Sequence, residues 1–222
     1  MSVTEARPEV GFAALIRSAT TGDHDRNESA GFMSALMAGD LDTDAVAALS
    51  ARLLMVYSAL ESVGEALTLD GVAGEFVDPA LYRVPALKDD LTTFRGDDPS
   101  AWVEESPAAR AYADHLRTAC PGDPGAFVAH HYTRYLGDLS GGRAIGAILR
   151  RTYGLEQAGA TFYEFAQIPD PVAYKRDYRD RLDALPSKGI DQAAFIAQVH
   201  QAYAMNEAMI GELGARFLKS TA

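Results

Sequence analysis

The sequence predicts an all-α fold in a single domain, because nearly every long segment repeats its apolar residues with the helical period of 3.6. Almost no segment alternates with the period of two that a half-buried strand requires. Four proline-containing stretches have the form of helix starts, and no internal repeat or long linker divides the chain. We therefore expect one bundle of seven or eight helices over residues 11–218, with a disordered tail at 1–10 and a C-terminal tail at 219–222.

Three helices are expected in the N-terminal part of the chain. The spacing of Phe12, Leu15 and Ile16 predicts a helix that runs to about residue 28. A short second helix begins near Phe32 and ends at Gly39. Residues 44–67 form a long amphipathic helix, in which the apolar positions are Val46, Leu49, Leu53, Val56, Tyr57, Leu60 and Val63.

The starts of the later helices are marked by a more specific sequence pattern. In "VDPALY", "ESPAAR", "GDPGAF" and "PDPVAY" an Asp or Ser precedes a proline, which is the pattern of an N-cap followed by the first helical residue. These stretches predict helices that open near Pro79, Pro107, Pro124 and Pro171. A final helix is expected from about residue 191 to 218.

The composition of the chain argues against several classes of protein. The 222 residues are 48% hydrophobic, enough for a sizeable core, and the net charge of −11 argues against binding to nucleic acid or an anionic membrane. Cys120 is the single cysteine, which excludes an intrachain disulfide and a cysteine zinc cluster. The first residues lack the apolar run of a signal peptide, and no stretch has the ~18 consecutive apolar residues of a membrane span. We expect a soluble, cytoplasmic protein.

The stretch "HHYTRYLGDLSGGRAIGAIL" (130–149) combines helical periodicity with four glycines. Each interior glycine costs about 1 kcal/mol relative to alanine, so this helix is expected to bend. Gly137 and Gly141 share one helix face, and Gly142 and Gly146 repeat the spacing one position along. Tight packing of helices, or a break between two of them, explains this pattern as well as a flat ligand lying against the backbone. Asp138 adds a carboxyl group among apolar neighbours, where it needs partners.

The run "AHHYTRYLGDLSGG" resembles the signature of the haem oxygenases, and the similarity extends from about Ala14 to the last helix, closest to soluble bacterial, biliverdin-producing members. The resemblance implies haem b held between a proximal helix and a kinked, glycine-rich distal helix. Haem is both substrate and cofactor in that family. It is cleaved with O2, and with electrons from an external reductase, to biliverdin (the α isomer by default), CO and Fe2+.

Five histidines are candidate iron ligands, and composition does not choose among them. His24 has Glu28 four residues later on the same helix face, a spacing that also suits an ordinary surface pair. The segment "LIRSATTGDHDRNESAGFM" is similar to the family's proximal segment. That resemblance makes His24 the axial ligand, Glu28 its partner, and Phe32 and Met33 residues of the pocket wall. The neighbourhoods of His130 and His131 indicate packing, and His115 and His200 show no feature of a site.

Haem propionates require cations, and "YKRDYRDRL" places Lys175 and Arg179 on one helix face. Taken alone, this pattern is better explained by a solvated face with an Arg179–Asp183 pair. The resemblance implies that Lys175, Arg179 and Tyr132 bind propionates and that Arg17 lies at the haem edge. Many relatives carry a second lysine where this chain has Thr21, which makes the proximal rim less basic.

On the distal side the resemblance implies that Asp138 delivers a proton through ordered water. Gly137 and Gly141 would let the helix backbone crowd the bound oxygen toward one ring edge. Further residues match family positions near the water network or the haem, namely Tyr57, Arg134, Ser140, Gly142, Tyr203 and Asn206. Arg143 stands where the family commonly has Gln, a departure that the sequence does not explain.

A non-catalytic haem carrier or store of the same fold is the alternative function. Asp138 favours the enzyme, because a carrier has no need of a distal carboxyl group. A ferredoxin or a flavoprotein reductase is the expected electron donor, and a monomer is the expected state. No nucleic acid and no membrane anchor are expected.

Overall fold

The computed structural model describes residues 11–28, 31–155 and 158–218, and these residues form helices and connecting turns with no β-strand among them. The predicted all-α fold is confirmed. The two predicted tails, 1–10 and 219–222, lie outside the described residues, as does the side chain of Glu28.

The α-helices follow one another closely. Their bounds are α1 Phe12–Ala19, α2 Thr21–Glu28, α3 Gly31–Ala38, α4 Thr43–Ala66, α5 Val84–Arg95, α6 Pro107–Ala119, α7 Pro124–Gly137, α8 Arg143–Tyr153, α9 Pro171–Ala184 and α10 Gln192–Phe217. Short 3₁₀ turns lie between several of them, including Pro79–Leu81 and Thr161–Tyr163.

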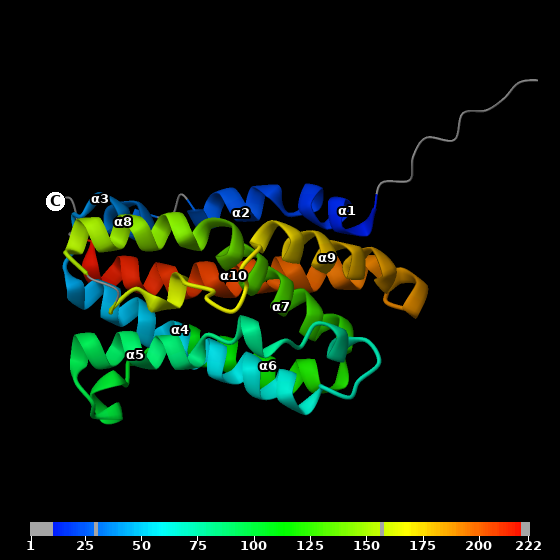
Figure 1. Ribbon diagram of the computed structural model, residues 1–222, viewed down its shortest axis with the longest axis horizontal. Coiled ribbons are helices and arrows are strands. Elements are labelled where there is room, and N and C mark those ends of the chain that lie inside the picture. The colour runs from blue at the N-terminus through cyan, green and yellow to red at the C-terminus, as the bar shows by residue number, and fades with distance from the viewer. Residues whose placement is uncertain (1–10, 29–30, 156–157, 219–222) are drawn as a thin grey trace, which may run out of the picture.

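The longest helix, α10, runs through the middle of the molecule and divides the others into two groups (Figure 1). On one side lie α1, α2, α3, α8 and α9, and on the other side α4 packs against α5 and α6. Helix α7 crosses between the groups and packs along α10, which also contacts α2. This arrangement places α2 and the α7–α8 junction on facing sides of one region of the molecule.

The Asp-Pro and Ser-Pro patterns mark helix starts as predicted. Asp123 is the N-cap of α7, where its side chain accepts a hydrogen bond from the Ala126 N–H at 3.0 Å. Ser106 and Asp170 cap α6 and α9 in the same way. The prediction at Pro79 is wrong in extent, because only a 3₁₀ turn forms there. A helix through this segment would place the Pro85 ring against the carbonyl of Leu81 and lack one N–H donor, so α5 begins only at Val84.

The predicted first helix is divided in two. Helix α1 ends at Ala19 and α2 begins at Thr21. The intervening Thr20 is buried, and its hydroxyl donates a 2.9 Å hydrogen bond to the Ile16 carbonyl. Such a bond from a threonine side chain competes with the helical ladder and bends the chain.

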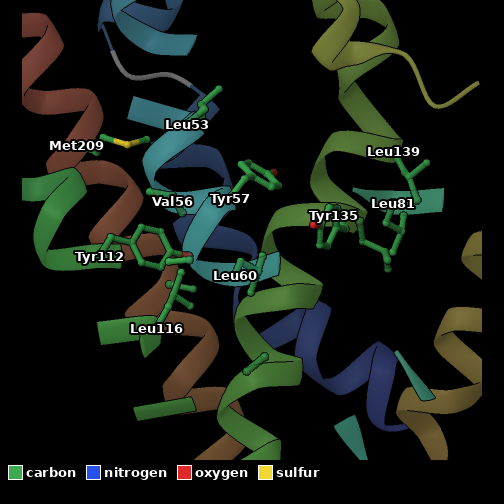
Figure 2. Close-up of a cluster of buried hydrophobic side chains, with 14 of the residues drawn as sticks. Leu53, Val56, Tyr57, Leu60, Leu81, Tyr112, Leu116, Tyr135, Leu139 and Met209 are labelled. Atoms are coloured by element: carbon green, nitrogen blue, oxygen red, sulfur yellow. The ribbon is translucent and has the colours of Figure 1, made fainter. Parts of the chain in front are cut away.

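The core gathers around α4 (Figure 2). Tyr57 is fully buried and makes edge contacts with the rings of Tyr135 and Phe162, at centroid distances of 5.5 and 5.4 Å. By length and composition α4 is apolar enough to cross a membrane, yet 78% of its apolar window is buried inside the protein. Its apolar character is therefore that of a central core helix.

His130 and His131 pack in the core, as the sequence predicts, with 0% and 3% exposure. The His131 ring stacks on Tyr178, and its Nδ1 lies 2.8 Å from the Tyr178 hydroxyl. Burial, and to a smaller extent the charge of Arg181, lower the pKa of His131 to about 3. A histidine in an unfolded chain has a pKa of about 6.5. The unfolded state therefore binds more protons than the folded state between these values.

Acid is expected to destabilise the fold in this window. The free energy of unfolding should fall as the pH drops from about 6.5 toward 3, by up to about 1.4 kcal/mol per pH unit for His131 alone. His131→Gln removes this titration, so the slope of its free energy of unfolding against pH should be smaller by up to about 1.4 kcal/mol per pH unit. Urea unfolding between pH 7 and pH 4 measures both slopes, and equal slopes would contradict the assignment.

The glycine-rich stretch does not break the helix. Residues Asp138–Gly142 form a π-helical turn that joins α7 to α8 without leaving helical backbone angles. A π turn widens the helix by one residue and often lies at functional sites. The two helices run in different directions on either side of this turn (Figure 1), so the predicted bend is present.

Candidate active site

A cavity of about 310 Å³ lies where α2 and α3 face the α7–α8 junction, with α4 and α10 behind. It brings together residues far apart in the sequence. Its walls are formed by His24, Asn27, Met33, Met37, Leu49, Leu53, Thr133, Arg134, Gly137, Asp138, Gly141, Gly142, Ile145, Phe162, Tyr163, Tyr203, Asn206 and Ile210. We call this cavity the central cleft.

The four glycines have two different roles. A Cβ added at Gly137 or Gly141 would meet no heavy atom of the described residues within 4 Å, so bare backbone faces the cleft. A Cβ at Gly142 or Gly146 would instead approach Tyr163, at 3.4 and 2.8 Å. One glycine pair therefore leaves open space at the cleft, and the other permits close packing against Tyr163.

The wall that faces Gly137 and Gly141 carries the predicted axial histidine, and we call it the proximal wall. His24 lies on α2, its side chain is 49% exposed, and its ring makes an edge contact with Tyr203 at 6.5 Å between centroids. Met33 also lines the cleft. Phe32 does not, because its side chain is buried against the ring of Phe217. The side chain of the predicted partner Glu28 lies outside the described part of the structure.

Asp138 is the acidic group on the side of the cleft formed by the α7–α8 junction, which we call the distal wall. Its carboxyl accepts a hydrogen bond from the hydroxyl of Tyr57. Burial raises the pKa of Asp138, and the nearby charge of Arg134 and the Tyr57 hydrogen bond oppose this effect in part. Burial also raises the pKa of Tyr57, so this hydroxyl remains a donor. A carboxyl group with a raised pKa, in a cleft, is suited to proton transfer.

A chain of hydrogen bonds crosses the cleft from Asp138 to the helix that carries His24. Arg134 donates from Nε to the Tyr57 hydroxyl at 3.2 Å and from Nη1 to Asn206 Oδ1 at 2.5 Å. Asn206 then donates from Nδ2 to Asn27 Oδ1 at 2.7 Å. The proximal and distal walls are thus joined by side chains from α2, α10, α7 and α4.

Asn27 is expected to be energetically coupled to Asn206. In a double-mutant cycle with Asn27→Ala and Asn206→Ala, the loss in the free energy of unfolding should be non-additive by about 0.5–1.5 kcal/mol. Guanidinium unfolding of the ligand-free protein measures the cycle. Asn27→Ala combined with Gln192→Ala, an exposed position on the same helix as Asn206, is the control and should be additive. Additive losses for the Asn27 and Asn206 pair would show that the bond contributes nothing.

The predicted propionate ligands gather outside the cleft wall, at its rim. Lys175 on α9 donates from Nζ to Ser140 Oγ of the π turn at 3.3 Å. Burial raises the pKa of Tyr132, while the charges of Arg179 and then Arg17 lower it. These arginines are exposed, and the helices that carry them, α1 and α9, pack against each other. The structure thus brings Lys175 to Ser140, next to the cleft residue Gly141, and the charges of Arg17 and Arg179 act on Tyr132.

Several cleft residues were not predicted from the sequence. Asn27 follows His24 by three residues and shares its helix face, so helical spacing could have identified it. Phe162 and Tyr163 come from a 3₁₀ turn with no recognisable pattern. The other unpredicted residues are Met37, Leu49, Leu53, Thr133, Ile145 and Ile210.

The fold and the cleft define an all-α protein that presents an imidazole on one wall and bare helix backbone with a partly buried carboxyl group on the other. The family model described as Heme oxygenase matches residues 10–212. Heme oxygenase 1 of the cyanobacterium Synechocystis is 34% identical over 214 residues, which cover 95% of this chain and 88% of that protein. The chain belongs to the haem oxygenase family.

Solved structures agree with this assignment. The crystal structure of the Synechocystis heme oxygenase-1 in complex with heme superposes with a TM-score of 0.86 at 34% identity, over 93% of this chain and 94% of that one. The heme oxygenase of Leptospira interrogans gives a TM-score of 0.85 at 31% identity, over 91% of this chain and 100% of that one.

Proposed function

We propose that this protein cleaves haem to biliverdin, CO and iron, with O2 and external electrons, in the central cleft. The observation that carries the proposal is the pairing of His24 on one wall with Gly137, Gly141 and Asp138 on the other. Relatives of this fold are known in complex with heme. We further propose that residues 11–218 act as one domain.

The residues of the cleft suit a flat macrocycle. A side chain at Gly137 or Gly141 would fill the space that these positions leave open beside the π turn. The imidazole of His24 is the kind of ligand that haem iron takes. At the rim, Lys175 and Arg179 would pair with the two acidic groups of haem, joined by Tyr132 and Arg17.

Haem, when bound, supplies the iron chemistry that activates O2 and is itself the molecule oxidised. In this mechanism the chain contributes orientation and protons. The backbone at Gly137 and Gly141 would lie close to bound haem and restrict the space beside it, which would limit where the macrocycle can be oxidised. Asp138 holds a proton at its carboxyl group and passes it on through water, while Tyr57 and Arg134 fix the orientation of that group.

A haem carrier of the same fold is the second candidate, and Asp138 argues against it. Removing a carboxyl group from water in the cleft costs free energy that haem storage does not require. The hydrogen bond from Tyr57 and the charge of the nearby Arg134 guanidinium offset part of that cost. Proton transfer explains why the cleft contains this carboxyl group and its two partners, and a carrier performs no proton transfer.

We also propose the finer features of this activity. The protein acts as a monomer in the cytoplasm and receives electrons from a ferredoxin or a flavoprotein reductase. The exposed cations of the rim, Arg17 and Arg179, support an acidic donor in a chain whose net charge is −11. The product is the α isomer of biliverdin.

Aerobic turnover of the hemin complex tests the proposal. After hemin is added, ascorbate or a ferredoxin with its reductase is supplied, and the absorption spectrum is followed. Loss of the Soret band with a rise of biliverdin absorption is the expected result, and chromatography of the product identifies the isomer. A Soret band that persists would favour the carrier, and a failure to bind hemin would exclude both functions.

A further inference from the structure

A second cavity, of about 490 Å³, lies outside the central cleft. It is bounded on one side by Leu139 and the outer face of α8, and on the other by the segment from Tyr163 to Pro171. Tyr163 separates the two cavities, because it lines both. We call the second cavity the α8 pocket. Its volume falls in the range of sites that hold small organic molecules, roughly 300–1,000 Å³.

The wall opposite α8 is irregular in backbone but is held firmly by Arg83. This arginine is 6% exposed and donates to the carbonyls of Leu81, at 2.8 Å, and Phe162, at 3.2 Å. It also donates to the Glu164 carbonyl, and its guanidinium group stacks over the Phe165 ring at 3.9 Å. The aromatic wall of the pocket is therefore preformed, which lowers the entropic cost of binding.

The helical wall is basic. Arg143 and Arg150 are seven residues apart and face the pocket with Gly146 and Ala147 between them. Seven residues of helix rise about 10 Å. No acidic residue occurs in α8, although the chain as a whole carries a net charge of −11. Glu164 also lines the pocket and pairs with Arg150, so the unpaired positive charge of the lining is that of Arg143.

Two donors of this wall are unused within the part of the chain that the structure describes. Arg143 is exposed and makes no ion pair with a described residue. Arg150 pairs through Nη2 with Glu164 and with the Ala160 carbonyl, but its buried Nε–H has no acceptor among the described residues.

We propose that the α8 pocket binds a small organic anion with a flat apolar body, whose acidic group pairs with Arg143. The apolar body lies against Phe165, Ile168 and Pro169. The volume of about 490 Å³ has room for a body of two fused rings. The site does not depend on the proposed haem chemistry, because the central cleft is on the other side of Tyr163.

Calorimetric titration of the hemin-loaded protein with 2-naphthoate tests this proposal. Hemin occupies the central cleft, so binding there does not interfere, and an unchanged Soret band shows that haem is not displaced. One equivalent of 2-naphthoate is expected to bind, and the neutral 2-naphthamide should bind at least about tenfold more weakly. Ala147→Phe, which places a ring inside the pocket, should abolish binding.

Arg143→Gln is expected to weaken 2-naphthoate binding by at least about tenfold, while the matched control Arg151→Gln leaves it unchanged. Arg151 is exposed on the same helix and does not line the pocket. An equal unfolding midpoint for all variants shows that they are folded. Absence of binding to the wild type, equal binding of the amide, or wild-type affinity in Arg143→Gln would each overturn the proposal.

Discussion

Replacing His24 with alanine is expected to reduce haem cleavage by at least about 100-fold, equivalent to about 2.7 kcal/mol. The side chain is half exposed and lies on a short helix, so its loss removes an imidazole without opening the core. Hemin should still enter the cleft through contacts with its other walls. The absorption spectrum of the complex and the initial rate of biliverdin formation measure the two effects separately.

His200→Ala is the matched control. His200 has a similarly exposed side chain, 45% against 49%, and its Nδ1 pairs with Asp23 on the same helix as His24. This variant should keep the wild-type hemin spectrum and rate. Added imidazole should restore part of the activity of His24→Ala, because it supplies the missing ligand. A wild-type spectrum and rate in His24→Ala would refute the axial assignment.

Replacing Asp138 with asparagine is expected to retain hemin and to lower the yield of biliverdin by about 10²–10⁴-fold, the usual contribution of a general acid or base. Asparagine keeps the shape of the side chain and an acceptor for the Tyr57 hydroxyl, so the packing should survive. The affinity for hemin and the product yield per bound hemin are the two measurements. Unchanged yield would remove Asp138 from the mechanism.

Glu61→Gln provides a matched control for Asp138→Asn. Burial raises the pKa of Glu61 as it does that of Asp138. Glu61 is 7% exposed, accepts from the Arg83 and Val84 N–H groups, and does not line the cleft. Its replacement should lower stability without reducing yield per bound hemin. An equal loss of yield in both variants would mean that any buried carboxyl group has this effect.

The pH profile gives a finer test of the Tyr57 contact. The hydrogen bond from Tyr57 lowers the pKa of Asp138 against the larger effect of burial. Tyr57→Phe removes that donor, so the pKa of Asp138 should rise further. If the protonated carboxyl group is the active form, activity falls as pH rises through this pKa, and the alkaline limb of the profile should move to higher pH in Tyr57→Phe. An alkaline limb at the same pH in both proteins would show that this limb does not report the titration of Asp138.

The sequence predicts those features that depend on residues close together along the chain. The proline N-cap patterns located the starts of α6, α7 and α9, because a cap is satisfied within its own first turn. The division at Thr20 and the short turn at Pro79 were missed. Both result from local details, a hydroxyl bonded back to a carbonyl and a second proline six residues later, that periodicity does not register.

The candidate site could be predicted only where a motif named its residues. Asp138, Gly137 and Gly141 lie in one continuous run. The bond between Asn27 and Asn206 joins positions separated by 179 residues, and it depends on how α2 packs against α10. Helical spacing gives the face of a residue but not the opposite helix, so such contacts require the tertiary structure.

The shape of the distal wall depends on the one additional residue that the π turn contains. Deleting one residue within 138–142 would let α7 and α8 merge into an ordinary α-helix, a change that the backbone should tolerate well. The π turn absorbs its additional residue, so α8 would keep nearly its present orientation after the deletion. Within the turn four residues would take the place of five, and Asp138, Gly141 and Gly142 could no longer point in their present directions together. Natural length variation should therefore be absent from these five positions in active members, even though it would cost the helix itself little.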